Sequence, residues 1–249
     1  MRIVDSHFHI GGCRVFDLNV TEEDVIDVLK NYGFSSLILQ PFPGAFPQPP
    51  EHVLNKIYEL SNKYEGRIYG IVSINPHVVE PDEWKSQVRK YIKDCGFVGI
   101  KLHTIGHAIN LMSQDAAMIF KEANELNVPL MVHTGLGQPF ASPSHILYYA
   151  EEYPDLKIVL AHAGFIFSAV DALLMAKKYK NIYLETSWST REDIQLFIEK
   201  IGANKVMFGT DLPSNIPIEL AKVNAMNMTD DQRDWFLHRT AEQVFNIKV

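Results

Sequence analysis

Histidine and aspartate residues recur in short motifs along this chain, each at or just after the end of an apolar run. "VDSHFHIGG" (residues 4–12) contains two histidines one residue apart, and later motifs end in "KLH", "MVH", "LAH" and "FGTD". The residues in question are His7, His9, His103, His133, His162 and Asp211. Neutral imidazoles and carboxylates suit a borderline divalent metal, which can activate water at neutral pH. The motifs therefore indicate metal-assisted chemistry, provided that the fold brings them together.

Short β-branched runs alternate with longer amphipathic stretches from one end of the chain to the other, which indicates alternating strands and helices. The predicted strands are residues 2–7, 36–40, 67–74, 97–103, 129–133, 157–162, 181–186 and 205–210. The predicted helices are 21–32, 51–64, 81–94, 113–126, 142–152, 166–178, 190–200 and 217–246, the last with a break near Met228 and Thr229. Thr21, Ser113 and Thr190 precede acidic residues and are expected to cap their helices.

This alternation favours parallel strands that are covered by helices on their outer face. Eight such units in a chain of 249 residues predict an α/β fold, a (β/α)8 TIM barrel with residues 1–249 as a single domain. An open doubly wound sheet is the alternative, but no Gly-x-Gly-x-x-Gly turn follows any predicted strand. The proline-rich segment 40–50 is interpreted as a semi-rigid loop within one βα unit.

A barrel would bring the motifs together at one end. Side chains two residues apart on a strand share a face, so His7 and His9 are expected to project together. Active sites of such barrels lie at the carboxyl ends of the strands, where the later motifs also fall. His7, His9, His133 and Asp211 would then supply three nitrogens and one oxygen to a metal and leave a position for water.

Composition limits the class of partner. The formal charge of −7 provides no basic surface for nucleic acid. No apolar stretch reaches the roughly 18 residues that a membrane span requires, and the amino terminus lacks the apolar segment of a signal peptide. Two cysteines in the chain are typical of a reducing compartment. We therefore expect a cytoplasmic protein that acts on a small molecule, with neither nucleic acid nor membrane as a partner.

The motifs "DSHFH", "GIKLH", "VHTG", "LAHAG" and "FGTDLP", in this order, resemble those of the amidohydrolase superfamily. The pattern is most similar to the amidohydrolase-2 branch, which contains metal-dependent hydrolases and aminocarboxymuconate-semialdehyde-decarboxylase-like enzymes. The similarity extends from Val4 to about Pro213, and "HRTAEQVF" (238–245) resembles the closing helix of the family. The resemblance implies that His7, His9, His133 and Asp211 are the metal ligands and that His162 is a catalytic histidine, with Asp5 supporting the first motif.

Other residues allow more than one interpretation. Lys101 stands where binuclear members of the superfamily carry a carboxylated lysine, although the amidohydrolase-2 branch resembles a one-metal design. His103 shares the strand face of Lys101, so it is a candidate for a second metal or for the substrate. Arg14, Arg191 and Trp188 follow strand ends and could contact substrate, and Phe42 and Phe46 could form an apolar wall or lid.

Three functions are compatible with these motifs. The leading hypothesis is hydrolysis of a C–O or C–N bond in a small carbonyl compound, with Asp211 accepting the proton of a metal-activated water and His162 donating a hydrogen bond to the carbonyl oxygen. The alternative is non-oxidative decarboxylation of a small unsaturated or aromatic carboxylic acid. A non-catalytic binding protein is the third.

For the cofactor we expect one divalent ion, with Zn²⁺ the best match and Mn²⁺ or Fe²⁺ also compatible with these ligands.

Overall fold

The computed structural model describes residues 2–137 and 139–248. Within these residues the sheet has nine strands in the order β2-β1-β3-β4-β5-β6-β7-β8-β9, and every neighbouring pair except β1–β2 is parallel. The parallel strands are β1 (Val4–Cys13), β3 (Ser36–Pro41), β4 (Ile68–Val72), β5 (Gly99–Leu102), β6 (Leu130–His133), β7 (Ile158–Ala161), β8 (Ile182–Glu185) and β9 (Val206–Met207). Each corresponds to one of the predicted strands.

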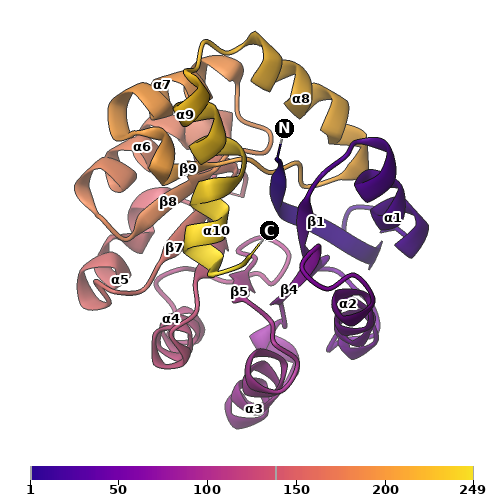
Figure 1. Ribbon diagram of the computed structural model, residues 1–249. Coiled ribbons are helices and arrows are strands. Elements are labelled where there is room, and N and C mark those ends of the chain that lie inside the picture. Colours follow the sequence, from indigo (N-terminus) through magenta and orange to yellow (C-terminus); the bar gives the residue numbers. More distant parts are fainter. Residues whose placement is uncertain (1, 138, 249) are drawn as a thin grey trace.

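Helices surround these strands on the outside, as Figure 1 shows. They are α1 (Glu22–Asn31), α2 (Glu51–Lys63), α3 (Pro81–Lys93), α4 (Gln114–Leu126), α5 (Leu147–Glu152), α6 (Ala169–Lys178), α7 (Arg191–Ile201) and α8 (Ile216–Ala225). The side chains of Thr21, Ser113 and Thr190 each accept a backbone hydrogen bond at the start of α1, α4 and α7, which confirms the predicted caps. The chain therefore has a mixed α/β fold of the TIM-barrel-like type.

Hydrogen bonds also join β1 to the residues that directly follow β9. Asp211 N donates to the His7 carbonyl at 2.7 Å, and His9 N donates to the Asp211 carbonyl at 3.1 Å. Ser6 N bonds the Phe208 carbonyl at 3.1 Å. β9 is shorter than the predicted strand because Phe208 N bonds the Phe236 carbonyl of the C-terminal segment. The segment after β9 thus lies beside β1 and brings Asp211 next to the first motif.

The C-terminal segment covers the amino-terminal end of the strands. It consists of α9 (Asp230–Asp234), a π-helical turn (Trp235–Arg239) and α10 (Thr240–Phe245), which crosses the front of the strands in Figure 1. Val244, Phe245 and Ile247 are buried in one apolar cluster with strand residues such as Met131 and Val159. The expected helix over 217–246 is broken at residues 226–229, where a break near Met228 and Thr229 was predicted, and it also contains the π turn. This packing leaves the opposite end of the strands for the polar motifs.

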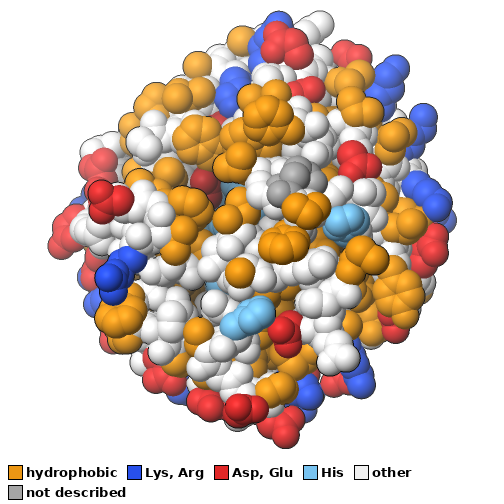
Figure 2. All heavy atoms as spheres, turned by 180° about the vertical axis from the view of Figure 1, so that it is seen from behind, with side chains coloured by type: hydrophobic (Ala, Val, Ile, Leu, Met, Phe, Trp, Pro, Cys, Tyr) orange, Lys and Arg blue, Asp and Glu red, His pale blue; other side chains and the backbone are white. Residues whose placement is uncertain are grey.

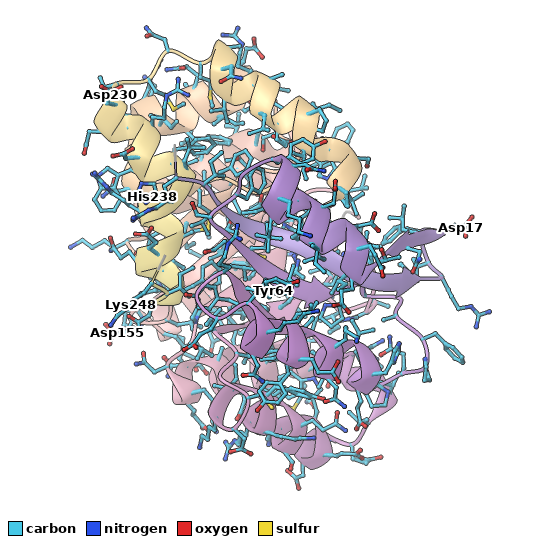
Figure 3. All side chains as sticks on the ribbon, turned by 45° about the vertical axis from the view of Figure 1, so that its right-hand side comes forward. Asp17, Tyr64, Asp155, Asp230, His238 and Lys248 are labelled. Carbon is cyan, nitrogen blue, oxygen red and sulfur yellow. The ribbon has the colours of Figure 1, made fainter. Side chains whose placement is uncertain are left out.

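A hairpin that the sequence analysis missed extends β1. β2 (Leu18–Val20) pairs with residues 11–13 of β1 in antiparallel register. Figure 3 shows Asp17, at the turn of this hairpin, projecting from one side of the molecule, while His238 and Lys248 lie on the opposite side. The hairpin carries Phe16 and Leu18 to the carboxyl end of the strands. Among the described residues no helix is both long enough and apolar enough to traverse a membrane.

Candidate active site

The two histidines of the first motif are held by hydrogen bonds that define where their protons lie. His7 Nδ1 is 2.7 Å from Glu185 Oε2, and His9 Nδ1 is 3.1 Å from the carbonyl oxygen of Pro41. Because a carbonyl or carboxylate oxygen only accepts, each Nδ1 carries the proton in the neutral imidazole. The Nε2 atom of each ring is therefore left with a lone pair.

These lone pairs converge with a carboxylate. The two Nε2 atoms are 3.3 Å apart, and each lies 3.3 Å from Asp211 Oδ1. Lys101 Nζ approaches His7 Nε2 at 3.1 Å, and Gln40 Nε2 approaches His9 Nε2 at 3.2 Å. Three acceptor atoms without a proton between them repel one another unless a cation is shared among them. The donor set of His7, His9 and Asp211 therefore fits a divalent metal, and their ligand atoms lie within 4.8 Å of one another.

His133 stands beside this set and offers another lone pair. Its Nε2 is 3.0 Å from the Leu136 carbonyl, so that nitrogen carries the proton. Its Nδ1 is buried and has no hydrogen-bond partner among the described residues. A buried acceptor without a partner is costly, and a bound cation would satisfy it. His133 lines the same cavity as His9 and Asp211, although it is not within the group whose ligand atoms are mutually closer than 4.8 Å.

His162 lies directly after β7, with its ring centroid 4.9 Å from those of His7 and His133. Its Nδ1 is 2.9 Å from Ser187 Oγ. His162, Trp188 and Asp211 all have positive φ, between 66° and 68°, which is unusual for residues other than glycine. Such backbone strain, roughly 1–3 kcal/mol per residue, is concentrated at functional sites. All three residues line the same cavity.

Glu185 links several of these groups, and the sequence analysis gave it no role. It is fully buried, and it accepts hydrogen bonds from His7 Nδ1, from Ser187 Oγ and from the backbone N–H groups of His162 and Ser187. Burial raises the pKa of Glu185, and the hydrogen bonds from Ser187 and His162 oppose this rise. An acidic residue at the end of the apolar run "NIYLET" was the signal that could have revealed it.

Asp5 contacts the first motif through the motif's backbone and not through a histidine ring. Its carboxylate accepts hydrogen bonds from the backbone N–H groups of His7 (3.2 Å) and Thr210 (3.0 Å) and from Thr210 Oγ1. It therefore stabilises the backbone where β1 meets the segment after β9. Glu185, not Asp5, accepts from the His7 ring. Burial raises the pKa of Asp5 to about 8.

Three of the four candidate metal ligands, His9, His133 and Asp211, line a cavity of about 290 Å³. Its polar lining is His9, His103, His133, His162 and Asp211. Its apolar lining is Phe16, Leu18, Phe42, Pro43, Leu136, Phe165, Trp188 and Leu212. Hydrophobic side chains also gather over the centre of the face shown in Figure 2, whereas charged side chains lie mostly towards its edge. The cavity suits a small molecule with a flat apolar body.

His103 and Lys101, the two residues predicted to serve either a second metal or the substrate, differ in their contacts. His103 Nδ1 accepts a hydrogen bond of 3.1 Å from Gly106 N, so the proton of the neutral ring is on Nε2. In this tautomer Nε2 carries a proton and has no lone pair, so His103, which lines the cavity, is better suited to donate a hydrogen bond than to bind a metal. Lys101 is buried and is not among the cavity-lining residues, and desolvation lowers the pKa of its amine to about 8.

Of the residues predicted to contact or enclose substrate, two aromatic ones line the cavity and the arginines do not. Trp188 lines the cavity, and its Nε1 also donates to Asp211 Oδ2 at 2.8 Å. Phe42 lines the cavity and stacks on the His9 ring with centroids 4.6 Å apart. Neither arginine is among the cavity-lining residues. Arg14 lies over the exposed Phe46 ring at 5.0 Å, and Arg191 pairs with its neighbour Glu192. Both arginines are exposed.

Proteins of known structure share this fold. A 5-carboxyvanillate decarboxylase from Novosphingobium aromaticivorans, solved with manganese and 4-hydroxy-3-methoxy-5-nitrobenzoic acid, is 15% identical, with a TM-score of 0.78 over 98% of this chain and 96% of that chain. A 2,6-dihydroxybenzoate decarboxylase from Rhizobium is 17% identical, with a TM-score of 0.74 over 98% of each chain. A protein described as a 2-pyrone-4,6-dicarboxylic acid hydrolase from Acinetobacter baumannii is 17% identical, with a TM-score of 0.69 over 99% of this chain and 100% of that chain.

The comparison with curated proteins finds no match. A family model described as amidohydrolase matches residues 57–247, which is more than half of the chain. The matched region contains His133, His162 and Asp211, and the first-motif histidines precede it. The protein therefore belongs to the amidohydrolase family, in the amidohydrolase-2 branch that its motifs predicted.

Proposed function

We propose that this protein is a metal-dependent, non-oxidative decarboxylase of a small unsaturated or aromatic carboxylic acid. The observation that carries the proposal is the convergence of His7 Nε2, His9 Nε2 and Asp211 Oδ1 beside a small cavity with aromatic walls. Decarboxylases of aromatic acids are among the structures that share the fold. These similarities favour decarboxylation over the hydrolysis that the sequence analysis put first.

The residues that would hold the metal are His7, His9, His133 and Asp211. When bound, a single divalent ion would act as a Lewis acid that stabilises negative charge on a substrate oxygen. The sequence analysis favoured zinc, but one of the decarboxylases with this fold was solved with manganese, so manganese is an equally strong candidate. Lys101 is proposed to remain an unmodified amine, because its Nζ already contacts His7 Nε2.

In the reaction the C–C bond to the carboxylate breaks, its electron pair stays on the substrate carbon, and CO2 leaves. A proton must replace CO2 on that carbon, and no oxidant or water is consumed. His162 and Asp211 are the cavity side chains proposed to hold or move that proton. His103 is proposed to donate a hydrogen bond from Nε2 to a substrate oxygen, and Phe42 and Trp188 to flank the substrate.

Product analysis separates this reaction from hydrolysis, the second candidate, which the similarity to the pyrone dicarboxylic acid hydrolase favours. The manganese-loaded and zinc-loaded protein would be incubated with dihydroxybenzoic acids and with lactones in ¹⁸O-labelled water. Release of CO2 without ¹⁸O in the organic product supports decarboxylation. Incorporation of ¹⁸O without CO2 release supports hydrolysis. Absence of turnover in both panels would favour the non-catalytic binding protein.

The position of Asp211 also depends on how the sheet closes. We infer that the hydrogen bonds between β1 and residues 208–211 close the sheet into a complete (β/α)8 barrel of one domain. A closed barrel would hold Asp211 at a fixed distance from His7 and His9, as a shared metal ion requires.

A further inference from the structure

A continuous chain of hydrogen bonds runs beneath the cavity from His162 to His7. His162 Nδ1 is 2.9 Å from Ser187 Oγ, Ser187 Oγ is 3.0 Å from Glu185 Oε2, and the same oxygen is 2.7 Å from His7 Nδ1. Ser187 and Glu185 are both fully buried. The chain therefore joins His162, which lines the cavity, to His7, whose Nε2 is one of the three converging acceptor atoms. All four residues of the chain are buried.

The direction of each hydrogen bond follows from counting protons. Each oxygen of the Glu185 carboxyl group accepts a hydrogen bond from a backbone N–H, Oε1 from Ser187 and Oε2 from His162, and His7 Nδ1 also lies against Oε2, so this group is placed as the acceptor of the chain. Ser187 has one hydroxyl proton, and giving it to His162 would leave two oxygens 3.0 Å apart with no proton between them. The hydroxyl therefore donates to Glu185 and accepts from His162, so the proton of neutral His162 is on Nδ1.

We propose that Ser187 is a positioning residue that, together with Glu185, holds His162 in the Nδ1–H tautomer. Neutral His162 then presents the lone pair of Nε2 to the cavity and is a proton acceptor. This differs from the expected role of His162 as a hydrogen-bond donor to a carbonyl oxygen. The proton of a substrate O–H group moves to Nε2, the O–H electron pair stays on the substrate oxygen, and the imidazolium retains its Nδ1 proton towards Ser187.

The effect of Ser187 on kcat rests on the proposed function. Replacement of the Ser187 hydroxyl tests this effect. Ser187→Ala should lower kcat of the metal-loaded enzyme about 10-fold to 100-fold, while KM changes less than about threefold and metal content stays at the wild-type level. Ser187→Thr keeps a hydroxyl and should recover kcat to within about threefold of wild type. Ser189 is the matched control, because within the described residues its hydroxyl donates to the backbone carbonyl of His162 and not to the ring, and Ser189→Ala should leave kcat unchanged. A wild-type kcat in Ser187→Ala, or equal losses in the alanine and threonine variants, would overturn the proposal.

The tautomer itself can be measured without a substrate, so the proposal can be judged even if the enzyme is not a decarboxylase. Two-bond ¹H–¹⁵N correlation spectra of zinc-loaded protein with ¹⁵N-labelled histidine distinguish a protonated from an unprotonated ring nitrogen. The His162 signals are assigned from their absence in His162→Asn. We expect a protonated Nδ1 and an unprotonated Nε2 in wild type, and a gain of the Nε2–H form in Ser187→Ala. A wild-type His162 protonated on Nε2 would refute the inference, whatever the activity.

Discussion

Trp188 Nε1 donates a hydrogen bond of 2.8 Å to Asp211 Oδ2, while the other oxygen of that carboxylate lies 3.3 Å from both His7 Nε2 and His9 Nε2. The backbone N–H of Trp188 is itself held by Glu219 Oε1 at 2.8 Å. Trp188 therefore fixes the orientation in which Asp211 directs Oδ1 towards the histidines. Orientation of a ligand by an outer hydrogen bond is a common determinant of metal affinity.

Replacing Trp188 with phenylalanine should consequently weaken metal binding by about 10-fold to 100-fold. The ring still fills the cavity wall, but Asp211 loses its donor and can rotate. Competition with a chelator of known affinity measures the change in metal Kd. Trp235→Phe, in the π turn away from the cavity, is the matched control and should bind metal as the wild type does. An unchanged Kd in Trp188→Phe would show that Asp211 orientation is set elsewhere.

Substitution of His7 tests the metal site directly. His7→Ala removes one Nε2 ligand and leaves Glu185 without the ring N–H, so metal content should fall from about one equivalent to near zero. Elemental analysis of protein purified without chelator gives the stoichiometry. His52 is exposed and outside the cluster, so His52→Ala should retain the metal. Two equivalents in the wild type would instead point to a carboxylated Lys101.

His162→Asn separates catalysis from metal binding. Because His162 is assigned to proton transfer and not to the ligand set, the variant should keep its metal and lose about 10²-fold to 10⁴-fold in kcat. Steady-state kinetics and elemental analysis are done on the same preparation. Loss of the metal along with activity would make His162 a ligand and would require a new assignment of the proton carrier.

The periodicity of the sequence was sufficient for the framework of this fold. Strand-end motifs such as those of His133 and Asp211 could be placed because parallel strands present their carboxyl ends on one side. β2 was missed because "LNV" is too short to show an alternating pattern. The π turn was missed because Trp235–Arg239 continues a helical pattern. Its Phe236 carbonyl accepts a hydrogen bond from Phe208 N, a tertiary contact that the sequence pattern does not reveal.

The site was predictable in its residue types and less so in its hydrogen bonds. Glu185 and Ser187 are distant in sequence from His7, and only folding brings the carboxylate to 2.7 Å from that ring. Arg14 and Arg191 had a suitable position in the chain, but sequence does not reveal the local partners that hold an arginine at the surface. The protonated nitrogen of each ring likewise depends on contacts such as Gly106 N to His103 that spacing cannot supply.

Packing of α10 against the amino-terminal end of the strands should contribute strongly to the free energy of unfolding. Phe245 is 2% exposed and packs with Met131 and Val159 under the amino-terminal end of the strands. Phe245→Ala should lower the free energy of unfolding by about 3–5 kcal/mol, through lost burial and the cavity left behind. Urea unfolding of the metal-loaded protein measures it. Phe167 is 75% exposed, and Phe167→Ala should change stability by less than about 0.5 kcal/mol. A loss below about 1 kcal/mol in Phe245→Ala would mean that α10 adds little to the core.

Tyr91 should make the fold sensitive to alkaline pH. It is 1% exposed, and desolvation raises the pKa of its phenol to about 12, from an ordinary value of about 10. Between these values the folded protein keeps a proton that the unfolded chain has released. The folded state thus binds more protons, and stability must fall as pH rises from about 10 to 12. At pH 11 this amounts to about 1 kcal/mol, since one pKa unit corresponds to about 1.4 kcal/mol.

Tyr91→Phe removes the ionisable phenol and should reduce this alkaline loss. The variant also lacks the hydrogen bond from Tyr91 to Asn55 Oδ1, which lowers its stability at every pH. The comparison is therefore between the changes in unfolding free energy from pH 9 to pH 11, measured by urea titration, and not between absolute stabilities. Tyr32→Phe alters an exposed ring and should keep the wild-type pH dependence. If Tyr91→Phe loses as much stability as the wild type over this interval, the phenol proton of Tyr91 is not what couples folding to alkaline pH.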